Sequence, residues 1–243
     1  MFTPMKSIRS FKLVDYVKAR KYCSLAELME VFHVSSATIH RDVAELVQRE
    51  VFQRVRGGVA FVDNTPSTRG GVASSSYMER RAVNASAKER IARSALDYVE
   101  EGDILFLDSS TTVAHLADEL TRSSYTSLTI ITNSVAVMQL FRRLPAHYVR
   151  IALGGNFDPQ LNSFLGQSAF RELDRLTITK AFVSGFGVDD KIATTNHEDQ
   201  AALVARVLEK ASRRYLLVDK TKFGRTGLYR LAARGSFDAI ISE

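Results

Sequence analysis

The chain has 243 residues, 45% of them hydrophobic, which allows either one large domain or two smaller ones with proper cores. No run approaches the roughly 18 apolar residues that a membrane helix needs, and the first residues lack the basic, apolar and small-residue order of a secretory signal. The single cysteine, Cys23, cannot form an internal disulfide. We therefore expect a cytoplasmic protein with no membrane partner. The formal net charge is +6, and residues 1–62 carry +4 of it, with ten Lys or Arg against six Asp or Glu, which favours a polyanionic partner.

Three helical stretches are predicted near the N-terminus, and a tight turn joins the second to the third. Residues 7–20 carry apolar side chains at helical spacing. Ser24 followed by Glu27 is a capping-box pattern, which predicts that a second helix begins there. A short turn at His33 then leads into a third helical stretch, and two helices that meet at a tight turn are typical of a helix-turn-helix motif.

The third helical stretch, residues 35–50, is the centre of this motif. Its inward stripe consists of Ile39, Val43, Leu46 and Val47. An arginine and several small or hydroxyl side chains lie off that stripe, as suits the major groove of DNA. The candidate DNA-binding residues of this helix are Ser35, Ser36, Ala37, Thr38, His40 and Arg41. The alternative is an ordinary amphipathic helix with a solvated outer face.

A β-hairpin follows this helix. Residues 52–56 and 59–62 are rich in β-forming residues and flank a Gly-Gly pair, which is a strong hairpin signal. Arg54 and Arg56 fall on one face of the first strand, within reach of phosphates. We therefore predict that residues 1–62 form a winged helix-turn-helix domain that binds double-stranded DNA.

The remaining chain has a different texture. Residues 63–76 are polar and turn-rich, as in a flexible linker. A capping box from Ser86 to Glu89 then predicts a helix, and short apolar runs alternate with amphipathic stretches to the end of the chain. This alternation predicts an α/β domain over residues 77–243, with a mostly parallel sheet covered by helices on both faces. The expected strands are 104–107, 128–131, 149–153, 181–183, 215–218 and 239–241, and further helices are expected at 113–120, 135–142 and 198–211.

Polar, small or charged residues follow five of these strands, at the edge where open α/β sheets bind ligands. The hydroxyl run from Ser109 to Thr112 leads into a helix, whose free N–H groups and dipole favour a phosphate, and Lys222 adds a positive charge. The alternative is that these hydroxyls only cap the helix. The candidate effector-binding residues are Asp108, Ser109, Ser110, Thr111, Thr112, Asn133, Gly154, Gly155, Gly185 and Lys222.

Other chemistry has less support. The sequence has no paired cysteines, no H-E-x-x-H pattern and no nucleotide P-loop, so we expect neither a metal nor a cofactor, and no catalytic residue. The enzyme alternative is a sugar-phosphate isomerase that uses Asp108 or Asp189 for acid–base chemistry. Such an enzyme has no use for a basic winged helix. A third possibility, a nonspecific nucleic-acid-binding protein with a structural second domain, leaves the polar strand ends unexplained.

These motifs resemble the DeoR family of bacterial sugar-operon regulators. Residues 34–43 match the recognition-helix motif V-S-x-x-T-I-R-R-D-L, and residues 54–59 match the wing motif R-x-H-G-G-A. His40 stands where the family usually has arginine, and Arg56 where it usually has histidine. The sensor-domain matches are Asp108 to Thr112 (with Ser110 at a frequent glycine), Thr132 to Ser134, Gly154-Gly155, Ala181-Phe182 with Gly185-x-Gly187, and Asp219 to Gly224.

The resemblance covers nearly the whole chain and implies a function. In this family the second domain is similar to ribose-5-phosphate isomerase and binds phosphorylated sugars. The resemblance therefore implies a sequence-specific regulator of a sugar-utilisation operon, usually a repressor, controlled by a phosphorylated sugar. Such regulators commonly pair half-sites by twofold symmetry, so we expect a homo-oligomer, either a dimer or a tetramer.

Overall fold

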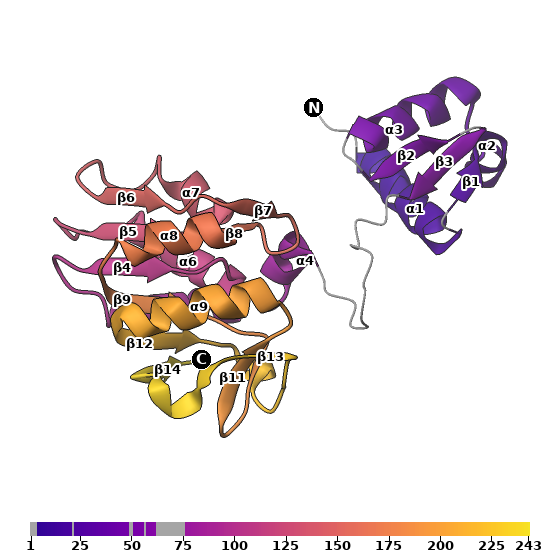
Figure 1. Ribbon diagram of the computed structural model, residues 1–243. Coiled ribbons are helices and arrows are strands. Elements are labelled where there is room, and N and C mark those ends of the chain that lie inside the picture. The colour runs from indigo at the N-terminus through magenta and orange to yellow at the C-terminus, as the bar shows by residue number, and fades with distance from the viewer. Residues whose placement is uncertain (1–3, 21, 49–50, 56, 62–75) are drawn as a thin grey trace. The chain divides into compact units, whose positions relative to one another are not determined.

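The computed structural model describes residues 4–20, 22–48, 51–55, 57–61 and 76–243 (Figure 1). The chain divides into two units, Met1–Ala73 and Ser74–Glu243. Of the linker expected over residues 63–76, only Ser76 is described. None of the described helices combines the length and apolar character that crossing a bilayer requires.

The described residues of the N-terminal unit form three helices and a three-stranded antiparallel sheet. The elements are α1 (Pro4–Arg20), β1 (Tyr22–Ser24), α2 (Leu25–Phe32), α3 (Ser36–Gln48), β2 (Phe52–Val55) and β3 (Gly58–Phe61), with strand order β1-β3-β2. Its core is formed by Leu13, Val17, Cys23, Leu28, Ile39, Val43, Leu46, Phe52 and Val59. The predicted helix-turn-helix and hairpin are confirmed. Strand β1 was not predicted, because three residues are too few to display a strand period.

The two glycines of the hairpin have different tasks. Gly57 has a φ of +84°, a left-handed conformation that glycine adopts without steric cost. At Gly58 the constraint is space, since a Cβ there would lie 2.2 Å from the carbonyl oxygen of Cys23. Strand β1 pairs directly with β3 at this point, with Ser24 opposite Gly58. Gly57 therefore allows the turn of the hairpin, and Gly58 allows β1 to pair with β3 as the third strand of the sheet.

Local hydrogen bonds define the helix-turn-helix. The Ser24 hydroxyl accepts a hydrogen bond from the Glu27 amide at 3.1 Å, which confirms the predicted cap, while the Glu27 carboxylate accepts one from the Tyr16 hydroxyl. His33 ends α2 with a φ of 50°. The Ser35 hydroxyl accepts from the Thr38 amide at 3.4 Å, so α3 begins where the sequence predicted.

The second unit is built on a six-stranded parallel sheet of order β14-β12-β9-β4-β5-β6. Its strands are β4 (Ile104–Leu107), β5 (Thr129–Thr132), β6 (Val149–Ala152), β9 (Ile178–Val183), β12 (Ala211–Leu217) and β14 (Ala239–Ile241). All neighbouring pairs are parallel. The predicted parallel sheet is confirmed, although β9 and β12 begin several residues earlier than expected.

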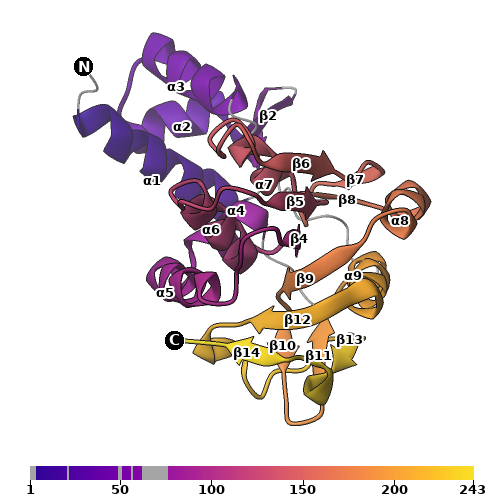
Figure 2. The same cartoon turned by 90° about the vertical axis from the view of Figure 1, so that its left-hand side faces the viewer.

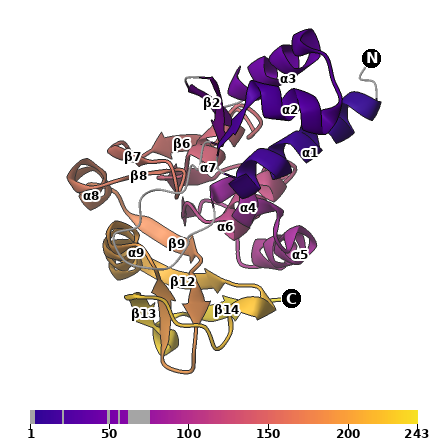
Figure 3. The same cartoon turned by 90° about the vertical axis from the view of Figure 1, so that its right-hand side faces the viewer.

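Helices cover both faces of this sheet (Figures 2 and 3). One face packs on α5 (Ala85–Leu96), α6 (Thr111–Leu120) and α7 (Val135–Leu140), and the other on α8 (Gln167–Asp174) and α9 (Glu198–Lys210). Side chains alternate along β4, where Leu105 and Leu107 face the first group and Phe106 faces the second. Burial on both faces explains why the strands are continuous apolar runs.

Several short elements were not predicted. They are α8, the hairpin of β7 (Asn156–Asp158) and β8 (Ser163–Leu165), and an antiparallel sheet of β10 (Gly187–Val188), β11 (Ile192–Thr195) and β13 (Tyr229–Ala233). The predicted capping box at Ser86 is wrong, since α5 begins at Ala85 after Asn84. Asn84 has a φ of 56°, and its side-chain amide donates to Asp219 at 3.3 Å instead of capping the helix.

Candidate functional site

The outer side of α3 is the expected DNA-binding face. Of its predicted inner stripe, Ile39, Val43 and Leu46 are buried and Val47 is half-buried, so the opposite side faces solvent. The exposed candidates are Ser35, Ser36, Ala37, His40 and Arg41. Thr38 is half-buried, and its hydroxyl lies 2.9 Å from that of Ser35. The Arg41 guanidinium forms no ion pair with any residue that the structure describes, so it remains available to a partner.

An internal ion pair holds α3 in place. Asp42 is buried, and its carboxylate accepts a hydrogen bond from Arg9 Nε of α1 at 2.7 Å. This pair raises the pKa of Arg9, mainly through the hydrogen bond. We did not identify Asp42 from sequence as a positioning residue. The available signal was its place three residues after Ile39, on the buried stripe.

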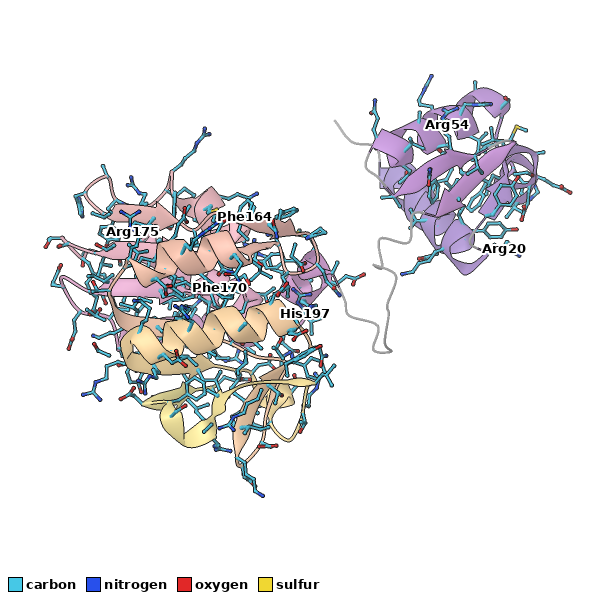
Figure 4. The ribbon with its side chains drawn as sticks, in the orientation of Figure 1. Arg20, Arg54, Phe164, Phe170, Arg175 and His197 are labelled. Atoms are coloured by element: carbon cyan, nitrogen blue, oxygen red, sulfur yellow. The ribbon has the colours of Figure 1, made fainter. Side chains whose placement is uncertain are left out.

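The wing contributes one described cation. Phe52 of β2 is buried, and the next three residues, including Arg54, are exposed (Figure 4). Arg54 thus lies on solvent-facing hairpin surface, where a DNA backbone has access. Arg56, the second cation expected here, lies outside the described residues.

At the carboxyl edge of the main sheet, Asp108 joins two strands. It follows β4 and is buried, and its two carboxylate oxygens accept hydrogen bonds from the backbone amides of Ser110 and Ser184, each at 2.9 Å. Burial raises the pKa of Asp108 to about 6, and the hydrogen bonds from Ser110 and Ser184 offset part of that effect. The carboxylate therefore ties the end of β4 to the end of β9.

The hydroxyl run lies at the start of α6, which begins two residues earlier than predicted. Ser110 is its N-cap, and the Ser110 hydroxyl accepts from the Val113 amide at 3.2 Å. Ser110 therefore caps the helix, and its contact with an effector remains a prediction. Ser109, Thr111 and Thr112 are buried around the same helix end. A helix N-terminus of this kind favours an anion.

Four other candidates already have structural tasks. The Asn133 side-chain amide donates to the Phe164 carbonyl at 3.1 Å. The Gly154 amide donates to Glu172 at 2.8 Å. A Cβ at Gly155, whose φ is +145°, would lie 2.3 Å from the Leu165 carbonyl oxygen, and one at Gly185 would lie 2.9 Å from that of Thr194. Close backbone packing thus explains Gly155 and Gly185 without a ligand, so contact with an effector remains a prediction.

Lys222 lies on a single 3-10 turn, η1 (Lys220–Lys222), after β12. Its Nζ is 5.7 Å from the ring centroid of Phe186, and the guanidinium carbon of Arg225 is 4.2 Å from the same centroid. Burial lowers the pKa of Lys222, Asp219 opposes this effect, and the positive charges of Arg225 and Arg80 lower the pKa further. Cations therefore outnumber the carboxylate of Asp219 around Lys222, an arrangement that suits an anionic ligand.

Sequence reasoning missed three polar residues of this edge. Tyr77 and Arg80 belong to α4 (Tyr77–Ala82), and Lys88 is a buried residue of α5. Burial lowers the pKa of Lys88 to about 8. His197 lies at the start of α9 (Figure 4), and burial lowers its pKa, an effect that Asp158 opposes and the charge of Arg80 reinforces. The described residues contain no His, Cys, Asp and Glu group suited to a metal ion.

Asp108 is expected to make the stability of the second unit depend on pH. The pKa of its carboxyl group is about 6 in the folded state, whereas the ordinary pKa of an aspartate is 3.8. The folded protein therefore keeps this proton at a higher pH than the unfolded chain does. The free energy of unfolding should therefore fall as pH rises from about 4 to about 6, by roughly 3 kcal/mol in all. Urea unfolding at intervals across this range, compared with Asp108→Asn, measures the effect. A constant difference between the two proteins across that window would contradict the raised pKa.

Comparison with known protein families gave two matches. The model of the DeoR-like helix-turn-helix domain matches residues 9–65, and that of the DeoR C-terminal sensor domain matches residues 83–243. Among curated proteins, the transcriptional regulator IolR of Bacillus subtilis is 30% identical over 98% of this chain and 92% of its own. A lactose phosphotransferase system repressor of Staphylococcus epidermidis is 30% identical over 96% of this chain and 90% of its own.

Among solved structures, ribose 5-phosphate isomerases resemble part of the chain. The enzyme of Plasmodium falciparum gives a TM-score of 0.42 at 15% identity, over 59% of this chain and 55% of its own. That of Methanocaldococcus jannaschii gives a TM-score of 0.40 at 19% identity, over 58% of this chain and 55% of its own. The chain thus spans about half the length of these isomerases.

Proposed function

Because the chain belongs to the DeoR family of transcriptional regulators, we propose that it binds operator DNA through its N-terminal unit, under the control of a phosphorylated sugar bound by its second unit. The observation that carries the proposal is the outer face of α3, which exposes Arg41 beside small and hydroxyl residues. The similarity to a lactose phosphotransferase system repressor supports repression of a sugar-utilisation operon. A DNA partner implies a cytoplasmic location.

We assign DNA binding to residues 1–62, the linker to 63–76 and effector sensing to 77–243. Helix α3 enters the major groove, with Arg41 at a base edge and the other exposed residues of its first turns around it. Arg54, and Arg56 by sequence, contact phosphates. This division follows the charge of the chain, since residues 1–62 hold most of its positive excess.

In the second unit, the effector's phosphate binds at the start of α6, among Ser109, Ser110, Thr111 and Thr112. Lys222 supplies a positive charge from the end of β12. The sugar hydroxyls lie toward Asp108, Asn133, Gly154, Gly155 and Gly185. Support comes from the buried hydroxyls at a helix N-terminus and from the cations gathered near the strand ends.

Replacing Lys222 by alanine tests this assignment. The variant should bind operator DNA as the wild type does, but its affinity for the phosphorylated sugar should fall roughly 10- to 150-fold, since a charged hydrogen bond is lost. Lys220→Ala, on the same turn but exposed, is the matched control and should respond normally. A thermal-shift screen against pentose and hexose phosphates identifies the effector, and operator titration with and without it gives the response. Equal responses from both variants would place the phosphate elsewhere.

We propose that the protein acts as a homo-oligomer, a dimer or a tetramer, because one winged unit reads few base pairs and regulators pair half-sites by symmetry. Light scattering at micromolar concentration should therefore give at least twice the 27.1 kDa of one chain. A monomer with full operator affinity would contradict this.

The raised pKa of Asp108 suits acid–base chemistry, but the isomerase alternative has less support than the regulator. Both oxygens of Asp108 accept backbone amides, and the Asp189 carboxylate accepts the amides of Lys191 and Ile192. IolR and the lactose phosphotransferase system repressor, which match this chain over nearly its whole length, are regulators. A turnover assay with pentose and hexose phosphates provides the direct check.

A further inference from the structure

Helix α4 is the first described element after the expected linker, and it packs at the carboxyl edge of the main sheet, where the candidate effector site lies. Ser76 and Glu79 form a complete capping box at its start. The Tyr77 ring packs in one cluster with Ala114 of α6 and Ala136 of α7. Lys88 donates hydrogen bonds to the carbonyl oxygens of Arg80 and Val83, and so holds the last turn. Helix α4 thus lies against the starts of α6 and α7.

Three buried polar atoms at this edge have no hydrogen-bond partner in the described part of the chain: Tyr77 Oη, Asn133 Oδ1 and Ser163 Oγ. They come from α4, the end of β5 and the start of β8. Ser163 bridges to Ser134, beside Asn133, so two of the three elements are directly joined. Buried polar atoms rarely lack a partner, so a cluster of them indicates a place where a polar ligand completes the hydrogen bonding.

The Tyr77 hydroxyl lies close to the candidate phosphate site. Burial raises the pKa of Tyr77, the charges of Arg81 and Arg80 oppose this effect, and the Asp108 carboxylate at the end of β4 adds a smaller increase. Ala114, against which its ring packs, is the fourth residue of α6. The same helix begins with the hydroxyl run, so Tyr77 faces the start of α6.

Arg80 connects α4 to the other side of this edge. Its Nη2 donates to the Gln160 carbonyl at 3.0 Å, in the turn between β7 and β8. The β7–β8 hairpin also contains Phe164, whose carbonyl oxygen holds the Asn133 amide. Burial is the main cause that lowers the pKa of both Lys222 and Lys88; Asp219 opposes it in both, and the charge of Arg80 lowers both further. Three cations from different elements thus lie within electrostatic range of one another and of Asp219, and an anion bound among them lowers the repulsion that Asp219 leaves.

We propose that α4 forms a wall of the effector site, with the Tyr77 hydroxyl donating to the bound sugar and the Arg80 guanidinium pairing with its phosphate. This inference rests on the proposed function, and it adds a route of control. A ligand changes DNA affinity only if it favours one arrangement of the protein over another. A ligand that contacts α4 favours the arrangement in which α4 is held against the site, and α4 is the element that directly follows the linker.

Two substitutions test the contacts. Tyr77→Phe removes one hydroxyl and keeps the ring between Ala114 and Ala136. It should leave stability unchanged and weaken binding of the most stabilising sugar phosphate roughly 2- to 10-fold, as expected for one neutral hydrogen bond. Arg80→Gln should weaken the same ligand roughly 10- to 150-fold, as expected for a charged hydrogen bond. Arg90→Gln, at an exposed position of α5, is the matched control and should bind the sugar phosphate as the wild type does.

Binding is measured by calorimetry on the full-length protein, with inorganic phosphate as a second probe. Phosphate binding should weaken in Arg80→Gln and remain unchanged in Tyr77→Phe, and operator affinity without ligand should remain unchanged in both. Both variants should also show a smaller operator response at saturating sugar phosphate.

If both variants bind the sugar phosphate as tightly as the wild type while Lys222→Ala binds it more weakly, this inference is overturned and the proposed function stays intact. Full operator response at saturation in both would reject α4 as the route of control. A wild type that responds to no sugar phosphate would reject the proposed function itself.

Discussion

Replacing Arg41 by alanine is expected to lower operator affinity roughly 5- to 150-fold, about 1–3 kcal/mol, if its guanidinium reads a base edge. The physical reason is the exposed position of Arg41 on α3, opposite the buried stripe of Ile39, Val43 and Leu46. Because the side chain forms no internal ion pair in the described residues, its removal should leave the N-terminal unit folded. The measurement is a gel-shift titration on a duplex selected from a random library.

Two further variants separate base contact from charge. Arg54→Ala on β2 should weaken all duplexes alike and reduce the salt dependence of binding, as expected for a phosphate contact. Arg171→Ala removes the same charge from an exposed position on α8 and should have no effect. If Arg41→Ala binds the selected duplex as the wild type does, α3 does not read the groove through this residue.

Replacing Lys180 by methionine is expected to destabilise the second unit by about 3–5 kcal/mol, the cost of removing one partner of a buried ion pair. Lys180 lies on the central strand β9, and its Nζ is 2.9 Å from Asp103 and 2.7 Å from Glu100. Asp103 is also buried, so methionine leaves its carboxylate without a counter-charge. Urea unfolding followed by circular dichroism gives the change in free energy.

The exposed Lys220→Met is the control and should change stability little. Adding Asp103→Asn to Lys180→Met should recover part of the loss, because the uncompensated charge is then gone. Asp103 and Glu100 precede β4, at the opposite edge from Asp108, so the folded variant should keep its effector response. A loss below about 1 kcal/mol would show that the pair contributes no more than an exposed one.

The N-terminal unit was largely predictable because its signals are local. The Ser24 cap, the turn at His33 and the stripe of α3 each involve residues within one or two helical turns. The third strand of its sheet was not predictable. Tyr22–Ser24 pairs with a segment more than thirty residues later, and only the need for glycine at position 58 reflects that pairing.

The arrangement of the candidate effector site at the carboxyl edge of the main sheet was predictable in part. Hydroxyl and glycine residues after apolar strands indicated Asp108, the start of α6 and Lys222, because parallel strands end at one edge. The residues contributed by α4 gave no such signal. Tyr77 and Arg80 belong to a six-residue helix between a polar stretch and α5, where a sequence pattern favours exposure. The burial of Tyr77 depends on its contacts with α6 and α7, and Arg80 is held by its hydrogen bond to Gln160, in the turn between β7 and β8.

By itself, the sequence determined the two-part organisation, the helix-turn-helix, the hairpin and the parallel sheet with helices on both faces. Caps, helical spacing and apolar runs act over a few consecutive residues, so the chain displays them directly. Only the tertiary structure decided that Asp42 is held by Arg9, that Gly154 donates to Glu172, and that Tyr77 of α4 packs against α6 and α7. These contacts join residues far apart in the chain, and they depend on strand order and helix packing, which no local pattern encodes.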